Sequence, residues 1–596
     1  MARNKFDQDE VLESPFQWSH LKRAFQYIRR HRVQMLLALG LSILASIASL
    51  YTPRIMERVL DEAVPNKDVQ ALIQWAVIFS VLILISIIFT LIRSRIMAYV
   101  SQEIIYDIRK DLFHHLQKLP FSYYDSRPAG KILVRVINYV NSVSDILSNG
   151  IINSILEIIN IAVIVVFMYS TNAMLATVII AGLPIFVGIV LILKPRQRKA
   201  WQMQSNKNSN YNAYLAESID GVRLSQIFAR QEENCSIMKR LAEACRQAWM
   251  KAIYVSNGVW LSSETLTQIV FTFLYVAGVY WMGGEIVSFG VILAMGSYVS
   301  RFWQPITNLA NIYNSFVNNI AYLERIFETM DEPIEVGDAI DAKELPTLTG
   351  EVNFEHVNFG YEEGQTVLKD LNLHVRPGER IALVGPTGAG KSTVVNLLCR
   401  FYNLRGGKIT LKCEDGSEQD ISQVTLESLR SQLGIMLQDS FIFSGTILSN
   451  IRYGKLDATD EEVITAAKAV CAHEFIDQMP QRYQTPVNER GSGLSQGQKQ
   501  LIAFARTLLS DPKILILDEA TSSIDTKTER LLQQGIEALL KGRTSFIIAH
   551  RLSTIKSCDR ILFIGDGGIL EAGSHDELMA KKGRYYDLYT AQMQAV

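Results

Sequence analysis

A glycine-rich run in the second half of the chain has the residues of a phosphate-binding loop. The run consists of Gly385, Pro386, Thr387, Gly388, Ala389, Gly390, Lys391 and Ser392, and Thr393 follows it. Residues 380–384 form an apolar stretch typical of a buried strand, and residues 393–399 read as a helix, which is the context that such a loop requires. We expect backbone amides to surround phosphate oxygens, Lys391 to reach the β and γ phosphates of a nucleotide, and Ser392 to bind Mg²⁺.

Two neighbouring carboxylates follow a second apolar stretch. Residues 514–517 are apolar, and Asp518 and Glu519 come directly after them. Two carboxylates at the end of one strand can have different roles, one in binding the metal and one in activating water. Asp518 would serve the metal, directly or through water, and Glu519 would orient or deprotonate the water that attacks the γ phosphate. A strand that merely ends in a solvated acidic pair is the alternative, and the phosphate loop upstream argues against it. The sequence therefore predicts hydrolysis of ATP.

Six apolar stretches occupy the first 310 positions, and each approaches or exceeds the roughly 20 residues with which a helix crosses hydrocarbon. They are centred on residues 33–53, 71–92, 150–170, 173–193, 258–282 and 286–306. The long connections 93–147 and 194–255 are rich in Lys and Arg. By the positive-inside rule these connections and both termini are cytoplasmic. We therefore expect hydrolysis to drive movement across a bilayer.

The changes in composition divide the chain into four parts. The expected fold class is multidomain, with an all-α six-helix transmembrane domain followed by an α/β P-loop NTPase domain. We expect a cytoplasmic N-terminal segment with an interfacial elbow helix at 1–32, the membrane domain with long cytoplasmic helical extensions at 33–330, a linker at 331–350 and the nucleotide-binding domain at 351–596. Pro and Gly interrupt the helical pattern at residues 121–130, and Gly does so at residues 216–222. These interruptions predict short transverse helices.

A few polar residues lie inside the predicted spans. Asn153, Glu157 and Asn160 follow one another at helical spacing on the third span, and Glu264 and Gln268 lie four residues apart on the fifth. Ionisable residues within a membrane are costly and are therefore candidates for function. These five residues form a candidate substrate cavity. Interhelical hydrogen bonds that only hold the helices together are an equally open interpretation.

Charge and cysteine content exclude some classes of protein. The formal net charge is −1, which gives no basic excess for a nucleic-acid partner. The six cysteines include no CxxC pair, so we expect reduced thiols rather than a metal site or disulfides. The residues before the first span contain no apolar signal region, so we expect no cleavable signal peptide.

The order of these motifs resembles the ATP-binding cassette (ABC) exporters, in particular half-transporters of the multidrug or lipid exporter type. The most specific element consists of Leu494, Ser495, Gln496, Gly497 and Gln498. It is similar to the family signature, which contacts ATP bound to the phosphate loop of the opposite subunit. The resemblance further implies that Tyr361 stacks on adenine and that Gln438 contacts Mg²⁺ and the attacking water. It also implies that Asp525 belongs to the loop crossing the dimer interface and that His550 senses the γ phosphate.

The resemblance implies a second half-transporter as partner. Gln496 stands where the family most often has glycine, and Pro486 and Asn488 also depart from the usual pattern. These departures resemble those of one subunit in heterodimeric exporters, so they favour a heterodimer, while a homodimer stays open.

The implied cycle is that of an ATP-driven exporter in the plasma membrane of a bacterium. ATP binding would dimerise the nucleotide domains and turn the cavity outward, and hydrolysis would reset it. The implied substrate is hydrophobic or amphipathic: a drug, a lipid or a peptide. An importer of metal chelates on an exporter scaffold stays open. A gated channel or regulator is a further alternative, against which Glu519 and His550 argue.

Overall fold

The computed structural model describes residues 18–127, 129–145, 150–282, 287–362, 364–436, 440–519, 526–549 and 552–594. The chain forms two compact units. The first contains Met1–Gln117 and Ala129–Glu332, and the second contains Lys118–Pro128 and Pro333–Val596. The short segment Lys118–Pro128 therefore packs with the C-terminal unit, although helices of the first unit flank it in sequence.

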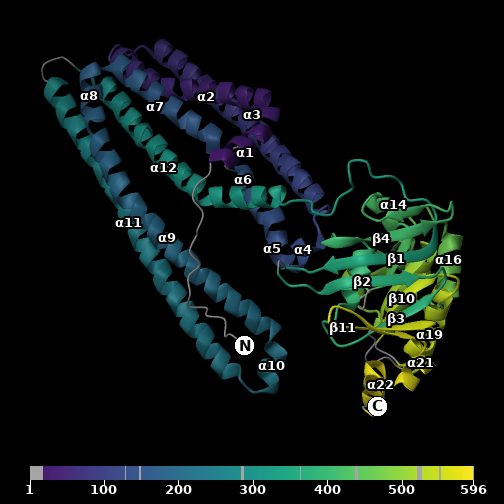
Figure 1. Ribbon diagram of the computed structural model, residues 1–596. Coiled ribbons are helices and arrows are strands. Elements are labelled where there is room, and N and C mark those ends of the chain that lie inside the picture. The colour runs from purple at the N-terminus through teal and green to yellow at the C-terminus, as the bar shows by residue number, and fades with distance from the viewer. Residues whose placement is uncertain are drawn as a thin grey trace. The chain divides into compact units, whose positions relative to one another are not determined.

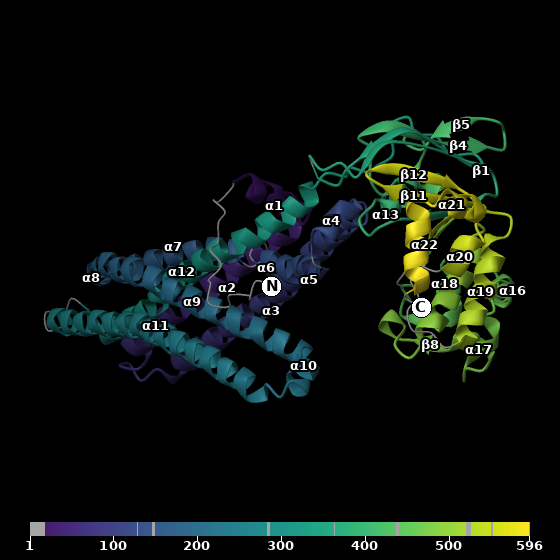
Figure 2. The same cartoon turned by 60° about the horizontal axis from the view of Figure 1, so that its bottom comes forward.

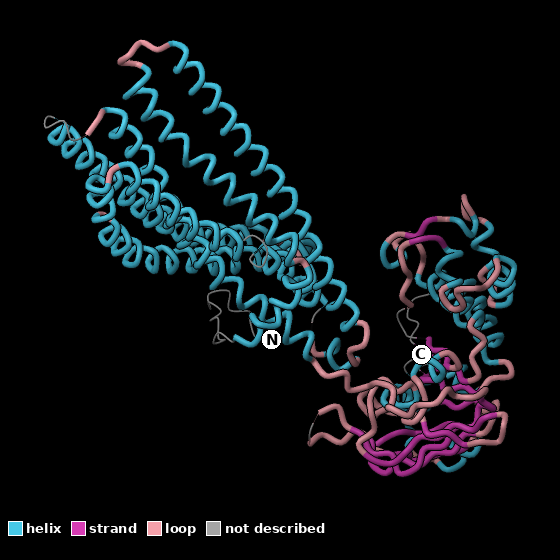
Figure 3. Tube along the Cα trace, turned by 90° about the horizontal axis from the view of Figure 1, so that it is seen from above, coloured by secondary structure: helices cyan, strands magenta, loops and turns pink. Residues whose placement is uncertain are grey.

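The described part of the first unit is helical (Figures 1 and 3). Its elements are α1 (Trp18–Arg30), α2 (Arg32–Arg58), η1 (Val59–Ala63), α3 (Val69–Leu116), α5 (Ala129–Val134), η2 (Arg135–Tyr139), α6 (Val140–Asp145), α7 (Ile151–Thr171), α8 (Ala173–Ala181), α9 (Leu183–Asp220), α10 (Val222–Ile227), α11 (Gln231–Met282) and α12 (Phe289–Asp331). The long helices α9 and α11 lie side by side, and α10 joins them at one end (Figures 1 and 2).

Among the residues that the structure describes, four helical stretches are long and apolar enough to cross a membrane. They are Arg32–Ala63, Val69–Leu116, Ile151–Thr171 and Ala173–Asp220. The predicted fifth span, 258–282, forms the end of α11, and residues 289–306 of the sixth lie in α12. None of the most apolar window of α3 is buried within the protein. Such a surface suits contact with lipid, because hydrocarbon chains pack against apolar side chains. The backbone N–H and C=O groups of a helix are already hydrogen-bonded within the helix, so they need no water.

Polar side chains cap the first turns of α3, α8 and α12. Asp68 accepts a hydrogen bond from the amide of Ala71 at the start of α3. Asn172 does the same for the start of α8, and Ser288 for the start of α12. Asp, Asn and Ser favour this position because their side chains satisfy amides that the first helical turn leaves unpaired. Local sequence thus fixes where these helices begin.

Helix α1 is attached to the two helices beside it by charged groups. Arg23 pairs with Asp331 at the end of α12, and the Arg30 guanidinium lies 2.8 Å from the Asp107 carboxylate of α3. The Arg23 guanidinium also lies 4.8 Å from the ring centre of Phe327. These basic residues of α1 therefore bind acidic residues of the protein. The expectation that α1 is an interfacial elbow stays a prediction.

The second unit contains a mainly parallel six-stranded sheet and an antiparallel four-stranded sheet. The six-stranded sheet has the order β12-β11-β3-β10-β9-β6 and the four-stranded sheet the order β2-β1-β4-β5. The strands are β1 (Leu348–Phe359), β2 (Leu368–Val375), β3 (Arg380–Val384), β4 (Gly406–Cys413), β5 (Glu418–Asp420), β6 (Leu433–Met436), β9 (Ile514–Glu519), β10 (Thr544–Ala549), β11 (Arg560–Gly565) and β12 (Gly568–Gly573), with a separate pair β7 (Gly445–Thr446) and β8 (Pro486–Val487). A helical unit followed by this α/β unit confirms the predicted fold class.

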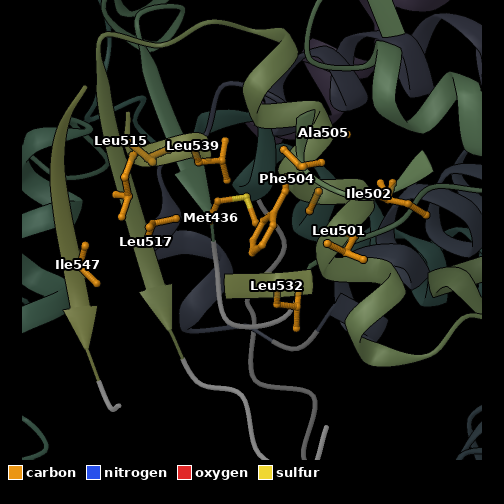
Figure 4. Close-up of a cluster of buried hydrophobic side chains, with 14 of the residues drawn as sticks. Met436, Leu501, Ile502, Phe504, Ala505, Leu515, Leu517, Leu532, Leu539 and Ile547 are labelled. Carbon is orange, nitrogen blue, oxygen red and sulfur yellow. The ribbon is translucent and has the colours of Figure 1, made fainter. Parts of the chain in front are cut away.

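Helices of the second unit complete its layers. They are α4 (Phe121–Asp125), α13 (Lys391–Leu398), α14 (Leu426–Arg430), α15 (Ile447–Arg452), α16 (Asp460–Ala469), α17 (His473–Asp477), α18 (Gln496–Leu509), α19 (Thr526–Leu540), α20 (Leu552–Lys556), α21 (His575–Lys581) and α22 (Arg584–Gln594), with single turns η4 (Arg482–Gln484) and η5 (Glu489–Gly491). Leu515 and Leu517 of β9 share one buried cluster with Leu501 and Phe504 of α18 (Figure 4). This core fixes α18 against the sheet whose strands lead into the candidate site.

Candidate functional site

The phosphate loop connects β3 to α13 and has a backbone that glycine alone suits. Gly385 has φ 144° and Gly390 has φ 99°, a region that side chains with a Cβ rarely adopt. A Cβ on Gly385 would also lie 2.2 Å from the carbonyl oxygen of Ile564 in the neighbouring strand. The loop is thus held against the sheet while the first amides of α13 remain available at its end.

The Lys391 side chain folds over this loop. Its Nζ donates hydrogen bonds to the carbonyl oxygens of Gly385, at 2.8 Å, and Pro386, at 2.9 Å. Burial lowers the pKa of the Lys391 ammonium group, and the negative charge of Asp518 opposes that shift. The charge of the Asp518 carboxylate therefore acts on the Lys391 ammonium.

Strand register explains how distant residues reach the same edge of the sheet. Parallel pairing aligns Asp518 with Ile548 and Glu519 with Ala549, while β3 pairs with the other side of β10. Carboxyl ends of adjacent parallel strands form the crevice where α/β folds bind ligands. The backbone of Glu519 thus ends β9 beside the residue that precedes His550 in the sequence.

Several predicted residues cannot be placed in this geometry. Gln438, Asp525 and His550 lie outside the described residues, and of Glu519 only the backbone is described. The strand β6, which ends at Met436, pairs with β9 so that Met436 lies opposite Leu517. The roles of these four residues stay predictions.

Tyr361 stands beside the phosphate loop. Its hydroxyl lies 3.1 Å from the Oγ1 of Thr393 on α13. The Tyr361 side chain is 49% exposed, and the rings of Phe359 and Tyr402 lie 5.0 and 5.1 Å from it, both edge to face. A fixed, half-exposed ring of this kind has the shape and chemistry of a stacking surface for a nucleobase.

The signature segment forms the start of α18. The amide of Gln498 donates to the Oγ of Ser495, and the amide of Ser495 donates in return to the Oε1 of Gln498. This reciprocal pair is a capping box. Leu494 packs on the buried core, while Ser495 and Gln496 are exposed. The positive end of the helix dipole is therefore presented at the surface of the unit.

Helix α4, the first predicted transverse helix, packs on the second unit through aromatic residues. The Phe121 and Phe401 ring centres lie 4.4 Å apart, and the Tyr402 hydroxyl donates a hydrogen bond to the Asp125 carboxylate. Burial and this hydrogen bond raise the pKa of Tyr402, so its hydroxyl stays protonated as a donor. Sequence reasoning missed Phe401 and Tyr402, because no local pattern identifies which aromatic residues meet a segment so far away in the chain.

The second predicted transverse helix starts later than the sequence indicated. Helix α9 continues to Asp220, and α10 begins at Val222. The break falls at Gly221, whose backbone leaves the helical region. Large apolar side chains around α10 are exposed, among them those of Leu224, Ile227 and Phe228.

A cavity of about 560 Å³ lies among α2, α3, α7 and α12 of the membrane unit. Asn153, Glu157 and Asn160 line it, as do Arg93 and Arg301. The two arginines were missed by sequence reasoning. Arg301 falls inside the predicted sixth span, and an ionisable residue at that depth was the signal that could have identified it.

Two of the predicted polar residues also connect helices. Asn308 of α12 donates to the Glu157 carboxylate at 2.7 Å, and Ser46 of α2 donates to Asn160. Gln268 instead donates to Glu264 on its own helix at 3.0 Å. Both side chains on α11 are exposed, and the cavity lining does not include them. A substrate-binding role for any of the five residues stays a prediction.

Two protein-family models match this chain, one in each half of the sequence. The ABC transporter transmembrane region family matches residues 35–306, and the ABC transporter family matches residues 368–522. The chain is 39% identical to the uncharacterized ABC transporter ATP-binding protein YknV of Bacillus subtilis, over 99% of this chain and 98% of that protein.

Further relatives carry names that include a transported compound. The fatty acid ABC transporter ATP-binding/permease protein of Mycobacterium tuberculosis is 37% identical over 84% of this chain and 78% of its own length. The putative multidrug export ATP-binding/permease protein YgaD of Bacillus subtilis is 34% identical over 96% of this chain and 99% of its own.

The fold also resembles a solved structure. A bacterial Atm1-family ABC exporter with ATP bound superimposes with a TM-score of 0.78 at 28% identity, covering 95% of this chain and 98% of that one. Family models, relatives and fold together show that this chain belongs to the ABC transporter family, as an exporter-type polypeptide that joins the transmembrane region to the ATP-binding domain.

Proposed function

We propose that the chain is one subunit of an ATP-driven exporter that moves hydrophobic or amphipathic compounds out of the cell. One observation carries this proposal. The glycine loop follows β3 and Asp518 lies near the end of β9, at the same edge of one parallel sheet, in a chain whose other unit contains membrane-length helices. The expected boundaries of the membrane domain, 33–330, and the nucleotide domain, 351–596, belong to this proposal.

The nucleotide site would bind ATP with Mg²⁺. Amides at the start of α13 and the Lys391 ammonium suit phosphate oxygens, Tyr361 suits adenine, and Ser392 and Asp518 supply the oxygen donors that a hard cation takes. Mg²⁺, when bound, supplies positive charge that offsets the charge of the phosphates. Gln438 is assigned to the metal and the attacking water.

The reaction is the transfer of the γ-phosphoryl group of ATP to water. A water oxygen bonds to the γ phosphorus as the bond to the β–γ bridging oxygen breaks, and the water proton passes to Glu519, which gives ADP and inorganic phosphate. His550 would contact the γ phosphate. The signature of one chain, residues 494–498, and Asp525 would complete the site of the opposite chain.

ATP would hold two chains together, and this closure would turn the membrane cavity outward. Helix α4 transmits the movement from its own nucleotide unit, on which Phe121 and Asp125 already pack. Helix α10 docks on the nucleotide unit of the partner, where its exposed residues Leu224, Ile227 and Phe228 would lose contact with water. Hydrolysis removes the γ phosphate and reverses the closure. ATP can drive this closure only if the closed dimer binds ATP more tightly than the open one does.

The partner is a second half-transporter. Gln496 in the signature, together with Pro486 and Asn488, favours a heterodimer over a homodimer. The names of the relatives, which include fatty acid transport and multidrug export, favour a lipid or drug substrate. We place the protein in the plasma membrane of a bacterium as a multi-pass protein with both termini in the cytoplasm.

Transport in membrane vesicles tests the proposal. Inside-out vesicles that contain the full chain, alone or with a co-expressed half-transporter, should accumulate a fluorescent lipid or drug only when ATP and Mg²⁺ are supplied outside. Accumulation in right-side-out vesicles loaded with ATP would instead establish import. Passive flux of ions gated by ATP would establish a channel. Full ATPase activity of a demonstrably monomeric chain would contradict the dimeric mechanism.

A further inference from the structure

We infer that the cavity among α2, α3, α7 and α12 binds the anionic head group, a carboxylate or a phosphate, of an amphipathic molecule. This inference rests on the proposed export function and names the substrate class for it. The cavity volume of about 560 Å³ lies within the range of about 300–1,000 Å³ found for small-molecule sites.

The charge of the lining is positive. Arg93, Arg301 and Glu157 are its ionisable residues, so two guanidinium groups face one carboxylate. That carboxylate already accepts a hydrogen bond from Asn308 at 2.7 Å. A cationic ligand would meet two like charges and an acceptor that is partly engaged, whereas an anion would meet two donors of opposite charge.

Arg93 has an unsatisfied donor. Its Nε is buried without a hydrogen-bond partner, and within the described ranges its guanidinium makes no ion pair. A buried polar group without a partner costs free energy, and the cost is larger for a charged group than for a neutral one. A carboxylate or phosphate in the cavity would supply the missing acceptor, because both match the planar fork of an arginine.

Arg301 is held in place by neutral groups. It donates to the carbonyl oxygen of Ser49 at 2.7 Å and to the Ser49 hydroxyl at 3.2 Å. No carboxylate pairs with it among the residues that the structure describes. Since an arginine carries five N–H donors, these contacts orient the guanidinium and leave donors for a ligand.

The cavity suits a head group with a chain attached. Its lining runs along α7 from Asn153 to Ile164, a rise of about 16 Å, and on this helix the apolar side chains of Leu156 and Ile164 line the cavity together with the polar ones of Asn153, Glu157 and Asn160. On α3, Ser86, Thr90 and Arg93 line the cavity while Ile87 and Leu91, between them in sequence, are exposed and apolar. The helix thus separates a polar site from a surface suited to lipid, which is the arrangement an amphipathic ligand requires.

Equilibrium binding to the full-length protein in nanodiscs of phosphatidylcholine tests this inference without nucleotide. The probes are dodecanoate, dodecyl phosphate, dodecylamine and dodecanol, which share one chain and differ in head group. We expect both anions to bind at least tenfold more tightly than the amine and the alcohol.

Arg93→Gln and Arg301→Gln should each weaken anion binding roughly tenfold, as loss of a charged hydrogen bond does. Tighter binding of dodecanoate would identify a carboxylate head group, and tighter binding of dodecyl phosphate a phosphate.

Matched variants keep the experiment decisive. Arg95→Gln removes an exposed charge two residues away that does not line the cavity, and it should leave anion binding unchanged. Arg93→Lys and Arg301→Lys retain the charge and should retain much of the affinity, and they report on the site if a glutamine variant fails to fold. Equal binding of dodecylamine, or glutamine variants that fold and bind anions as the parent does, would overturn the inference.

The assay also separates this inference from the proposed function. Anion binding that depends on the two arginines, in a protein that moves no substrate with ATP, would contradict export and leave the site standing. ATP-driven transport of another substrate, without anion binding, would contradict the site and leave export standing.

Discussion

The hydroxyl of Tyr402 donates a hydrogen bond to the carboxylate of Asp125, across 277 positions of sequence. Tyr402 follows the phosphate-binding helix, and its ring also lies 5.1 Å from that of Tyr361. Asp125 ends α4, the short helix that follows the long helix α3 of the membrane unit in the sequence. A single side chain therefore contacts both the expected adenine platform and the expected transmitter of movement.

Replacing Tyr402 with Phe should weaken this connection while keeping the ring in place. Loss of a hydrogen bond to a carboxylate costs about 1.5–3 kcal/mol when the group is buried, and less here because the pair is partly exposed. We expect faster hydrogen exchange in α4 and a smaller stimulation of ATPase activity by transported compounds. A double-mutant cycle with Asp125→Ala supplies the control, and strictly additive effects would show that the two residues do not act together.

Replacing Glu519 with Gln should stop turnover and leave nucleotide binding intact. The amide keeps the size of the side chain and cannot accept the water proton, and general bases contribute about 10²–10⁴-fold. Single-turnover hydrolysis and equilibrium binding of ATP measure the two properties. Asp511→Asn, an exposed carboxylate of the same unit, is the control. Hydrolysis by the Glu519 variant at the rate of the parent would remove its assignment as the base.

Replacing Gly385 with Ala should destabilise the nucleotide unit and abolish ATP binding. The new Cβ would lie 2.2 Å from the Ile564 carbonyl oxygen, and crowding of this kind costs about 1–3 kcal/mol beyond the strain of the backbone. Gly416→Ala is the matched control, because Gly416 also has a positive φ but its Cβ would meet no atom within 4 Å. Thermal unfolding and ATP titration compare the two, and equal losses would refute the role of the contact with β11.

Cys399 should resist alkylation in the folded protein over the usual pH range. Burial raises the pKa of this thiol to about 12, because a low-dielectric environment disfavours the thiolate. Since the thiolate is the reactive form, reaction with N-ethylmaleimide should stay slow from pH 7 to pH 9 and become fast on unfolding. The exposed Cys235 is the internal control. Mass spectrometry of the labelled peptides checks both, and rapid labelling of Cys399 in native protein would contradict the burial.

The sequence by itself determined the membrane helices and the phosphate loop of this protein. Hydropathy over about 20 residues fixes a span, and Gly385–Ser392 carry the turn, the charge and the hydroxyl of the loop within eight neighbouring positions. Capping by Asp68, Asn172 and Ser495 is equally local. Such features depend on residues that are close along the chain, so a pattern can predict them.

Only the tertiary structure decided which distant side chains meet. The packing of α4 on Phe401 and Tyr402, and the gathering of Arg93 and Arg301 around one cavity, join residues hundreds of positions apart. Glu264 looked equivalent to Glu157 in the sequence, yet it is exposed on α11 while Glu157 lines the cavity. The physical reason is that helical periodicity places a residue on a face of its own helix, and only the packing of helices determines what that face contacts.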